Sequence, residues 1–336
     1  MRTFLFFILA MCLGGILSVL FFTRFDQNKT PSSLKKPQLK PLERYSYPNL
    51  RKIRFAKSAI VLTKEISHSE EINSYLFVFY VEGKKVTGLA NIPIESGSYP
   101  VIVLIRGYVD RDTYEAGVGT GHVGEALAKS GYITLAPDFL GYGESDTPTH
   151  NSIEERFQTY TTSLTLLSSI NSLSDTLATS SAKPDTNNVG IWAHSNGGQI
   201  ALTALELSGK KIPTALWAPV SKPFPYSVLY YTDEFEDEGK ALRKAIADFE
   251  KNYDIQKYSP TTYFSWIRAP IQIHQGFADT AVPWQWSEML FNKLEEKNKK
   301  VQLFTYPNAD HNLMPSGWSV AVERTTAFFD SHLKSK

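Results

Sequence analysis

Residues 189–198 read Val-Gly-Ile-Trp-Ala-His-Ser-Asn-Gly-Gly, which is an apolar run, a serine at position 195 and the start of a predicted helix. A sharp turn between a buried strand and a helix exposes such a serine at the edge of a sheet, where the helix N-terminus points its amide dipoles at it. The turn requires small residues two positions before and two after the serine, and Ala193 and Gly197 are small. We predict that Ser195 is a nucleophile; the alternative is a serine in an ordinary strand–helix loop.

Strands and helices are predicted to alternate on both sides of this turn. The apolar run 101–105 is typical of a strand covered on both faces, and residues 75–92 form a predicted hairpin around Gly83. Further strands are predicted over 132–136, 189–193, 214–217, 271–274 and 301–305, with helices over 123–129, 153–170, 197–207, 286–297 and 318–333. This order predicts an α/β fold with a mainly parallel sheet and helices on both faces.

Two further residues complete a chemical arrangement with Ser195. Asp279 lies in the loop after the strand 271–274, and His311 lies in the loop after the next strand, 301–305. The order serine, acid, histidine is typical of hydrolases of this architecture. A serine hydroxyl needs a base to take its proton, so we predict that His311 is that base and that Asp279 orients it. Taken alone, Asp279 reads as a helix N-cap and His311 as a surface residue.

The oxyanion of such a reaction needs hydrogen-bond donors. The backbone N–H of Asn196 is one, and we assign the second to Tyr108, through its backbone N–H or its phenol, because Gly107 before it allows close approach. Arg106 could equally be a structural ion-pair residue. We expect His194, inside the turn, and His274, at a strand end, to be packed rather than catalytic.

These segments together resemble the prolyl oligopeptidase-type catalytic domain of the α/β-hydrolase superfamily, with dipeptidyl aminopeptidases and acylaminoacyl peptidases among its members. The likeness covers residues 75–335 and includes the runs 86–93, 136–145 and 258–260 besides the three loops. It implies an α/β-hydrolase fold and the family's three catalytic roles for Ser195, Asp279 and His311. Arg106-Gly107 departs from the usual His-Gly pair, and we expect no β-propeller, so an esterase or other acyl hydrolase stays open beside a peptidase. A non-catalytic binding module is the alternative of another class.

The chain is predicted to have three parts. Residues 4–22 carry no charge and would span about 28 Å as a helix, so we expect residues 1–23 to be an N-terminal transmembrane anchor. A cleaved signal peptide and a buried soluble helix are the alternatives. Residues 24–52 contain four prolines among polar residues and are predicted to be an extended linker, followed by a catalytic domain over 53–336 with a small cap insertion at about 220–268. We expect the catalytic domain on the extracytoplasmic side, although the Lys and Arg count alone predicts the opposite.

Composition excludes several other functions. Lys plus Arg number 35 and Asp plus Glu 34, so the net charge of +1 gives no electrostatic reason for nucleic-acid binding. A single cysteine excludes an internal disulfide and a cysteine-based zinc site. Residues 119–124 fit a dinucleotide pattern, but they do not open directly from a strand, and we expect neither cofactor nor metal.

The acidic run 233–238 has two interpretations: a solvated helix start, or a group of carboxylates that attracts a cationic part of the substrate. The substrate is expected to be a small molecule or a peptide, and the oligomeric state is open.

Overall fold

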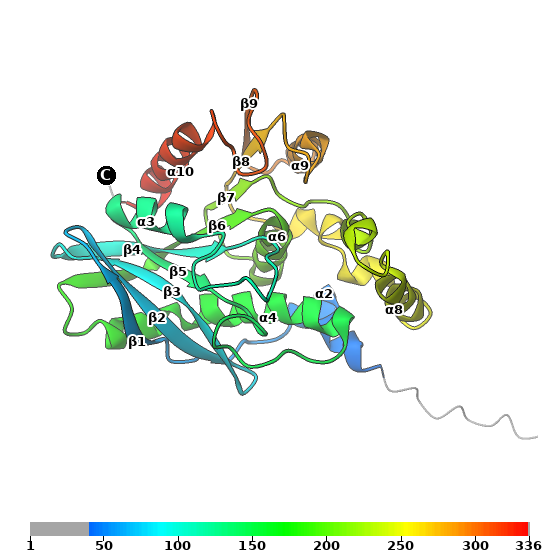
Figure 1. Ribbon diagram of the computed structural model, residues 1–336, viewed down its shortest axis with the longest axis horizontal. Helices are drawn as coiled ribbons and strands as arrows, with labels where there is room; N and C mark the ends of the chain where they lie inside the picture. The colour runs from blue at the N-terminus through cyan, green and yellow to red at the C-terminus, as the bar shows by residue number, and fades with distance from the viewer. Residues whose placement is uncertain (1–39, 335–336) are drawn as a thin grey trace, which may run out of the picture. The chain divides into compact units, whose positions relative to one another are not determined.

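The structure is a computed structural model that describes residues 40–334. In this part of the chain nine strands form one sheet in the order β1-β2-β3-β5-β4-β6-β7-β8-β9 (Figure 1). The strands from β5 to β9 in this order run parallel, while β1, β2 and β3 add an antiparallel edge. Their bounds are β1 Val61–His68, β2 Ile72–Val81, β3 Lys84–Pro93, β4 Gly97–Ile105, β5 Ile133–Pro137, β6 Ala182–His194, β7 Thr214–Trp217, β8 Ile271–Gly276 and β9 Val301–Tyr306.

Helices cover both faces of this sheet, as predicted (Figure 1). One face carries α3 Gly121–Lys129 and α10 Trp318–Leu333, and the other carries α4 Ser152–Ser169, α5 Leu173–Thr176, α6 Asn196–Ser208 and α9 Trp284–Glu295. Strand β4 shows how one apolar run serves both faces, because successive side chains of a strand point in opposite directions. Val101, Val103 and Ile105 pack with the α4–α6–α9 side, and Ile102 and Leu104 pack with the α3–α10 side.

The edge strand β1 was not predicted. Its side chains are almost all exposed, and polar residues such as Thr63, Lys64 and Glu65 occupy it, so the apolar alternation of a half-buried strand is missing. It pairs antiparallel with β2, and the register of this pairing shifts at two positions. Polar residues and bulges on an outer strand are typical ways of preventing edge-to-edge association.

The segment before β1 differs from the extended linker expected over 24–52. Residues 41–50 form a 3-10 helix, Pro41–Tyr45, and a short helix α2, Tyr47–Leu50. Tyr45, Tyr47 and Leu50 are buried in the main core, where the Tyr47 hydroxyl lies 2.6 Å from Thr203 Oγ1 and its ring stacks on Tyr263. The packed body therefore begins near Leu42 rather than at residue 53.

The predicted anchor, residues 1–23, and the linker up to residue 39 lie outside the described residues. Among residues 40–334, no helix is long and apolar enough to span a bilayer.

The insertion between β7 and β8 is a mainly helical cap. It contains α7 Tyr226–Leu229, η4 Thr232–Glu234, α8 Lys240–Glu250, η5 Ile255–Tyr258, η6 Pro260–Thr262 and η7 Phe264–Trp266. Phe157 of α4 anchors it by ring contacts with Phe224, Phe249 and Tyr258. The acidic run starts α8: Asp237 accepts hydrogen bonds from the amides of Gly239 and Ala241, both at 2.8 Å. The interpretation as a solvated helix start is therefore the one that the structure favours.

Candidate active site

Ser195 occupies a strained turn between β6 and α6. Its φ of 55° and ψ of −124° belong to a region that residues other than glycine rarely adopt. The main chain around it is fixed by three hydrogen bonds: Ser195 N donates to Trp217 O, and Ser195 O accepts from Gly198 N and Val220 N. The sharp strand–helix turn that the sequence predicts is thus present, and it sits at the carboxyl ends of the parallel strands.

Close packing explains why small residues flank the serine. A Cβ atom on Gly197 would lie 2.1 Å from Ile105 O and 2.6 Å from Arg106 O, so no side chain fits there. Ala193 is fully buried in the core and pairs in register with Ile105 and Leu216. The methyl group at position 193 is accommodated, which is why alanine can replace the more usual glycine.

Asp279 lies in the loop after β8 and accepts hydrogen bonds with both carboxylate oxygens. Oδ2 bonds to His311 Nδ1 at 2.9 Å and accepts from Gln275 Nε2 at 3.0 Å. Oδ1 accepts from the amides of Ala281 and Val282, at 2.9 and 2.8 Å. Burial alone would raise the pKa of Asp279, but these donors and the charge of His311 outweigh it and hold the pKa below its usual range. Asp279 is therefore an ionised carboxylate at neutral pH, and it caps the loop amides as well as binding the histidine.

His311 follows β9 and lies beside the turn that carries Ser195. Its ring centroid is 4.5 Å from that of His194, and His194 Nε2 lies 3.0 Å from His311 O. The loops after β6, β8 and β9 thus meet at one edge of the sheet, as the chain order predicts. Since Nδ1 of His311 is bonded to Asp279, Nε2 is the ring nitrogen left for proton transfer.

The two other histidines near this edge are packed, as expected. Burial is the main cause that lowers the pKa of His194 to about 4, and the charge of His311 is the second. Burial lowers the pKa of His274 to about 3, and its ring nitrogens lie within hydrogen-bond distance of Tyr306 Oη and Gln272 Oε1. Both rings are neutral at neutral pH and neither is suited to act as the base.

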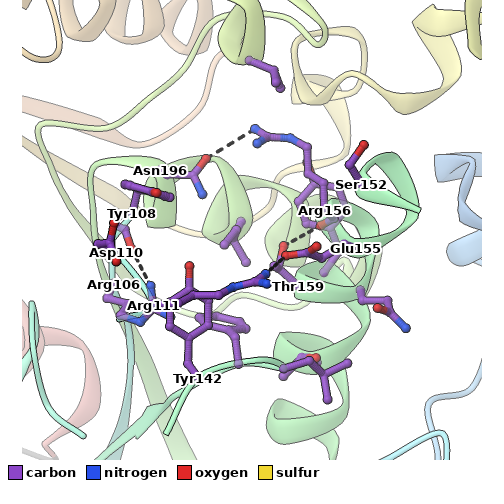
Figure 2. A pocket seen from close by; sticks show the side chains of 18 of the residues that line it. Arg106, Tyr108, Asp110, Arg111, Tyr142, Ser152, Glu155, Arg156, Thr159 and Asn196 are labelled. Carbon is purple, nitrogen blue, oxygen red and sulfur yellow. Dashed lines mark hydrogen bonds and ion pairs between the residues drawn. The ribbon is translucent and has the colours of Figure 1, made fainter. Parts of the chain in front are cut away.

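The loop after β4 approaches Ser195 directly. A Cβ atom on Gly107 would lie 2.8 Å from Ser195 Cβ and 3.3 Å from Ser195 Oγ. Tyr108 follows with 72% of its surface exposed, and Asn196, which begins α6, lies near it (Figure 2). Arg106 forms no carboxylate ion pair within the described chain: it donates to the backbone oxygens of Gly107 and Asp138, and its guanidinium lies 4.0 Å from the Tyr142 ring centroid. Through these contacts Arg106 fixes the loop after β4.

A cavity of about 550 Å³ opens beside this loop. Its lining includes Gly107 and Tyr108 of the loop after β4, Asn196 at the start of α6, and Val228, Phe235 and Leu242 of the cap. Figure 2 shows Arg156 of α4 directed across it toward Asn196, whose Oδ1 lies 3.3 Å from Arg156 Nη2. The same Nη2 also donates to Gln199 Oε1. The sequence offered no signal for Arg156, because it occupies a polar position of an amphipathic helix like its neighbours.

Solved structures with the same fold include esterases and peptidases. Acetyl xylan esterase 1 from Thermoanaerobacterium sp. JW/SL YS485 is 16% identical, with a TM-score of 0.57 over 88% of this chain and 94% of that chain. Dipeptidyl peptidase 4 of Porphyromonas gingivalis is also 16% identical, with a TM-score of 0.53 over 83% of this chain but 36% of that chain. Both likenesses show the α/β-hydrolase fold.

The chain belongs to the prolyl oligopeptidase family, whose model matches residues 120–336. A relative from Bacillus subtilis (strain 168), described as the uncharacterized peptidase YtmA, is 24% identical over 254 residues. The aligned region covers 74% of this chain and 90% of that relative. The predicted family resemblance is therefore confirmed, and fold and family together define a serine hydrolase of the α/β-hydrolase fold.

Proposed function

We propose that this protein cleaves a peptide, amide or ester bond through an acyl-enzyme formed on Ser195. The observation that carries the proposal is the 2.9 Å hydrogen bond between Asp279 Oδ2 and His311 Nδ1, beside the strained turn that presents Ser195. In this arrangement His311 takes the proton of the serine hydroxyl as it attacks the carbonyl carbon. Asp279 fixes the tautomer of the ring and stabilises the imidazolium that forms.

His311 then acts as an acid. It returns the proton to the leaving amine or alcohol as the tetrahedral intermediate collapses, which leaves the acyl group on Ser195. A water molecule, deprotonated by the same ring, attacks the acyl-enzyme and releases the acid. The ionised Asp279 supports both steps, since its lowered pKa keeps it charged at neutral pH.

The negative charge on the carbonyl oxygen needs donors on the other side of Ser195. The N–H of Asn196, at the start of α6, is one proposed donor, and Tyr108 supplies the other from the loop after β4. The absence of space for a side chain at Gly107 supports the main-chain route, because it lets that backbone approach the reacting carbonyl. The exposed phenol of Tyr108 remains the second route.

Two substrate classes fit this chemistry. A peptidase is favoured by the family and by the description of the Bacillus subtilis relative. A carboxylesterase is the alternative, and it is favoured by Arg106 in place of the family's usual histidine and by the fold shared with an acetyl xylan esterase. Comparing kcat/KM on matched p-nitrophenyl esters and aminoacyl p-nitroanilides distinguishes the two.

Labelling with a fluorophosphonate probe tests the catalytic assignment. We expect the wild-type chain to be labelled stoichiometrically, and the variants Ser195→Ala and His311→Ala to lose labelling while they keep the wild-type circular dichroism spectrum. A folded wild-type protein that resists the probe would point instead to a non-catalytic module that binds a ligand.

We further propose that residues 1–23 tether the protein to a membrane, with the catalytic domain on the extracytoplasmic side. The uncharged run 4–22 supports this, because its length matches the hydrocarbon thickness of a bilayer. Extraction of membranes with alkaline carbonate should leave the full chain in the pellet, and protease added outside intact cells should cleave it. Release by carbonate, or protection from the protease, contradicts the first or the second part of this proposal.

A further inference from the structure

Arg156 lines the cavity beside the loop that approaches Ser195. Within residues 40–334, no carboxylate forms an ion pair with it; Nη2 donates to the amide oxygens of Asn196 and Gln199. Its Nε is buried and has no hydrogen-bond partner among the described residues. Arg156 as a whole is half-buried, and a guanidinium that is partly withdrawn from water gains from pairing with an anion, because its charge is costly to desolvate.

The other two arginines of the cavity are already occupied. Arg106 is bound to backbone oxygens and to aromatic rings, and Arg111 forms an ion pair with Glu155 (Figure 2). Asp110 and Asp112 lie on the loop after β4 and are exposed, so water screens their charges. The interior of the cavity therefore keeps the positive charge of Arg156.

Tyr160 lies beside Arg156 on the wall of the cavity. It lies four residues after Arg156 on α4, which places both side chains on one face of the helix. Both residues line the cavity, and the Tyr160 hydroxyl interacts with the Arg156 guanidinium. The acceptors of Arg156 within residues 40–334 are neutral amide oxygens, and a carboxylate would match both the charge and the planar fork of the guanidinium.

The position of the cavity determines which part of a substrate would carry this group. The leaving group must lie next to His311, which protonates it. Neither His311 nor Asp279 lines the cavity, whereas Gly107, Tyr108 and Asn196, on the oxyanion side, do. The acyl part of the substrate therefore extends into the cavity, where Arg156 contacts the side chain of Asn196.

We propose that Arg156 binds a carboxylate on the acyl part of the substrate, so that the enzyme selects esters or amides of short acyl chains that end in a negative charge. This inference rests on the proposed function of Ser195, and it names the substrate class of that site. Arg156 is thus a specificity-determining residue, and Asn196 and Gln199 hold its guanidinium in place while the site is empty.

A matched pair of substrates tests this proposal: the p-nitrophenyl monoester of adipic acid, which carries a carboxylate, and p-nitrophenyl methyl adipate, in which that group is a neutral methyl ester. We expect the wild-type kcat/KM to be roughly 10- to 100-fold higher for the charged ester, as for a charge-assisted hydrogen bond. The variant Arg156→Gln should bring the ratio of the two values near one, and Arg156→Lys should retain part of it. The variant Arg268→Gln loses an exposed arginine outside the cavity and should keep the wild-type ratio.

Equal wild-type values for both esters, or an undiminished ratio in Arg156→Gln, would overturn the inference while leaving serine hydrolysis intact. A binding measurement covers the case in which neither ester is turned over. Calorimetry on Ser195→Ala should detect monomethyl adipate but not dimethyl adipate, and the added Arg156→Gln change should remove that binding. No difference between the two ligands would reject the carboxylate site independently of catalysis, whereas binding without turnover would reject only the proposed hydrolysis.

Discussion

His194 and His311 are in direct contact: their ring centroids lie 4.5 Å apart, and His194 Nε2 lies 3.0 Å from the main-chain oxygen of His311. With a pKa lowered to about 4, His194 is neutral at pH 7, so its single ring proton can reside on Nε2 and be donated to that oxygen. The residue that precedes Ser195 thereby fixes the loop that carries the proposed base.

Removing this contact should slow the reaction without unfolding the protein. We expect His194→Phe, which keeps a ring but loses the hydrogen bond, to lower kcat/KM about 5- to 10-fold, and His194→Ala to lower it further. Most of the loss should appear in kcat, since the ring does not line the cavity beside Arg156. Steady-state kinetics on a p-nitrophenyl ester measures this, with the exposed His150→Phe as control. Unchanged kinetics in both His194 variants would refute the positioning role.

Asp279→Asn should nearly abolish turnover. The amide can still accept from the amides of Ala281 and Val282 through its oxygen, but its NH2 group then faces His311 Nδ1 and Gln275 Nε2, which are both bonded to Oδ2 in the wild type. The wrong tautomer of His311 results, and kcat should fall by about 10³- to 10⁴-fold. Single-turnover acylation measured by stopped flow checks this. A decrease in kcat of less than about 10-fold would mean that Asp279 only caps the loop.

Gly197→Ala should destabilise the protein, because the added methyl group would lie 2.1 Å from Ile105 O. The backbone there cannot move without disturbing both β4 and the turn, so we expect a loss of about 3 kcal/mol or more in the free energy of unfolding, or no folded protein. Urea denaturation measures the change. Gly121→Ala is the matched control, since nothing lies within 4 Å of its added Cβ at the start of α3. Equal stability of the two variants would contradict the close approach.

Glu206→Gln should stabilise the protein increasingly as the pH rises. Both carboxylate oxygens of Glu206 are buried without a hydrogen-bond partner among the described residues, and burial raises its pKa well above 4.5. Above the unfolded pKa the native state binds a proton that the unfolded state releases, so the wild type loses stability as the pH rises from about 4.5 toward the folded pKa. The variant avoids this loss, and its advantage should grow by about 1 kcal/mol or more between pH 5 and pH 8. Urea denaturation at both pH values, with the exposed Glu125→Gln as control, decides the sign; a constant or shrinking advantage would be the contrary result.

The order of strands and helices was readable from the sequence because the parallel strands are buried on both faces. The run 101–105 is apolar for that reason, and the loops after the buried strand β8 and the strand β9 bring Asp279 and His311 to the turn at Ser195. Local chemistry and global topology agree at these positions.

Features that depend on tertiary contacts could not be predicted. Strand β1 gains its hydrogen bonds from β2 rather than from an apolar pattern of its own, and residues 41–50 are helical because Tyr45 and Tyr47 find partners far along the chain. Arg156 stands out only when the cap, α4 and α6 enclose it. The direction of a polar side chain is decided by neighbours that the sequence does not identify.

The buried rings of Tyr45 and Tyr47 have a practical consequence for producing this enzyme. A truncated form that starts at residue 53 would lose the ring of Tyr45 from α4 and the ring of Tyr47 from between α6 and the cap. Removing a buried aromatic ring costs roughly 3 kcal/mol or more in the free energy of unfolding. Expression of a stable catalytic fragment therefore requires a start upstream of Leu42.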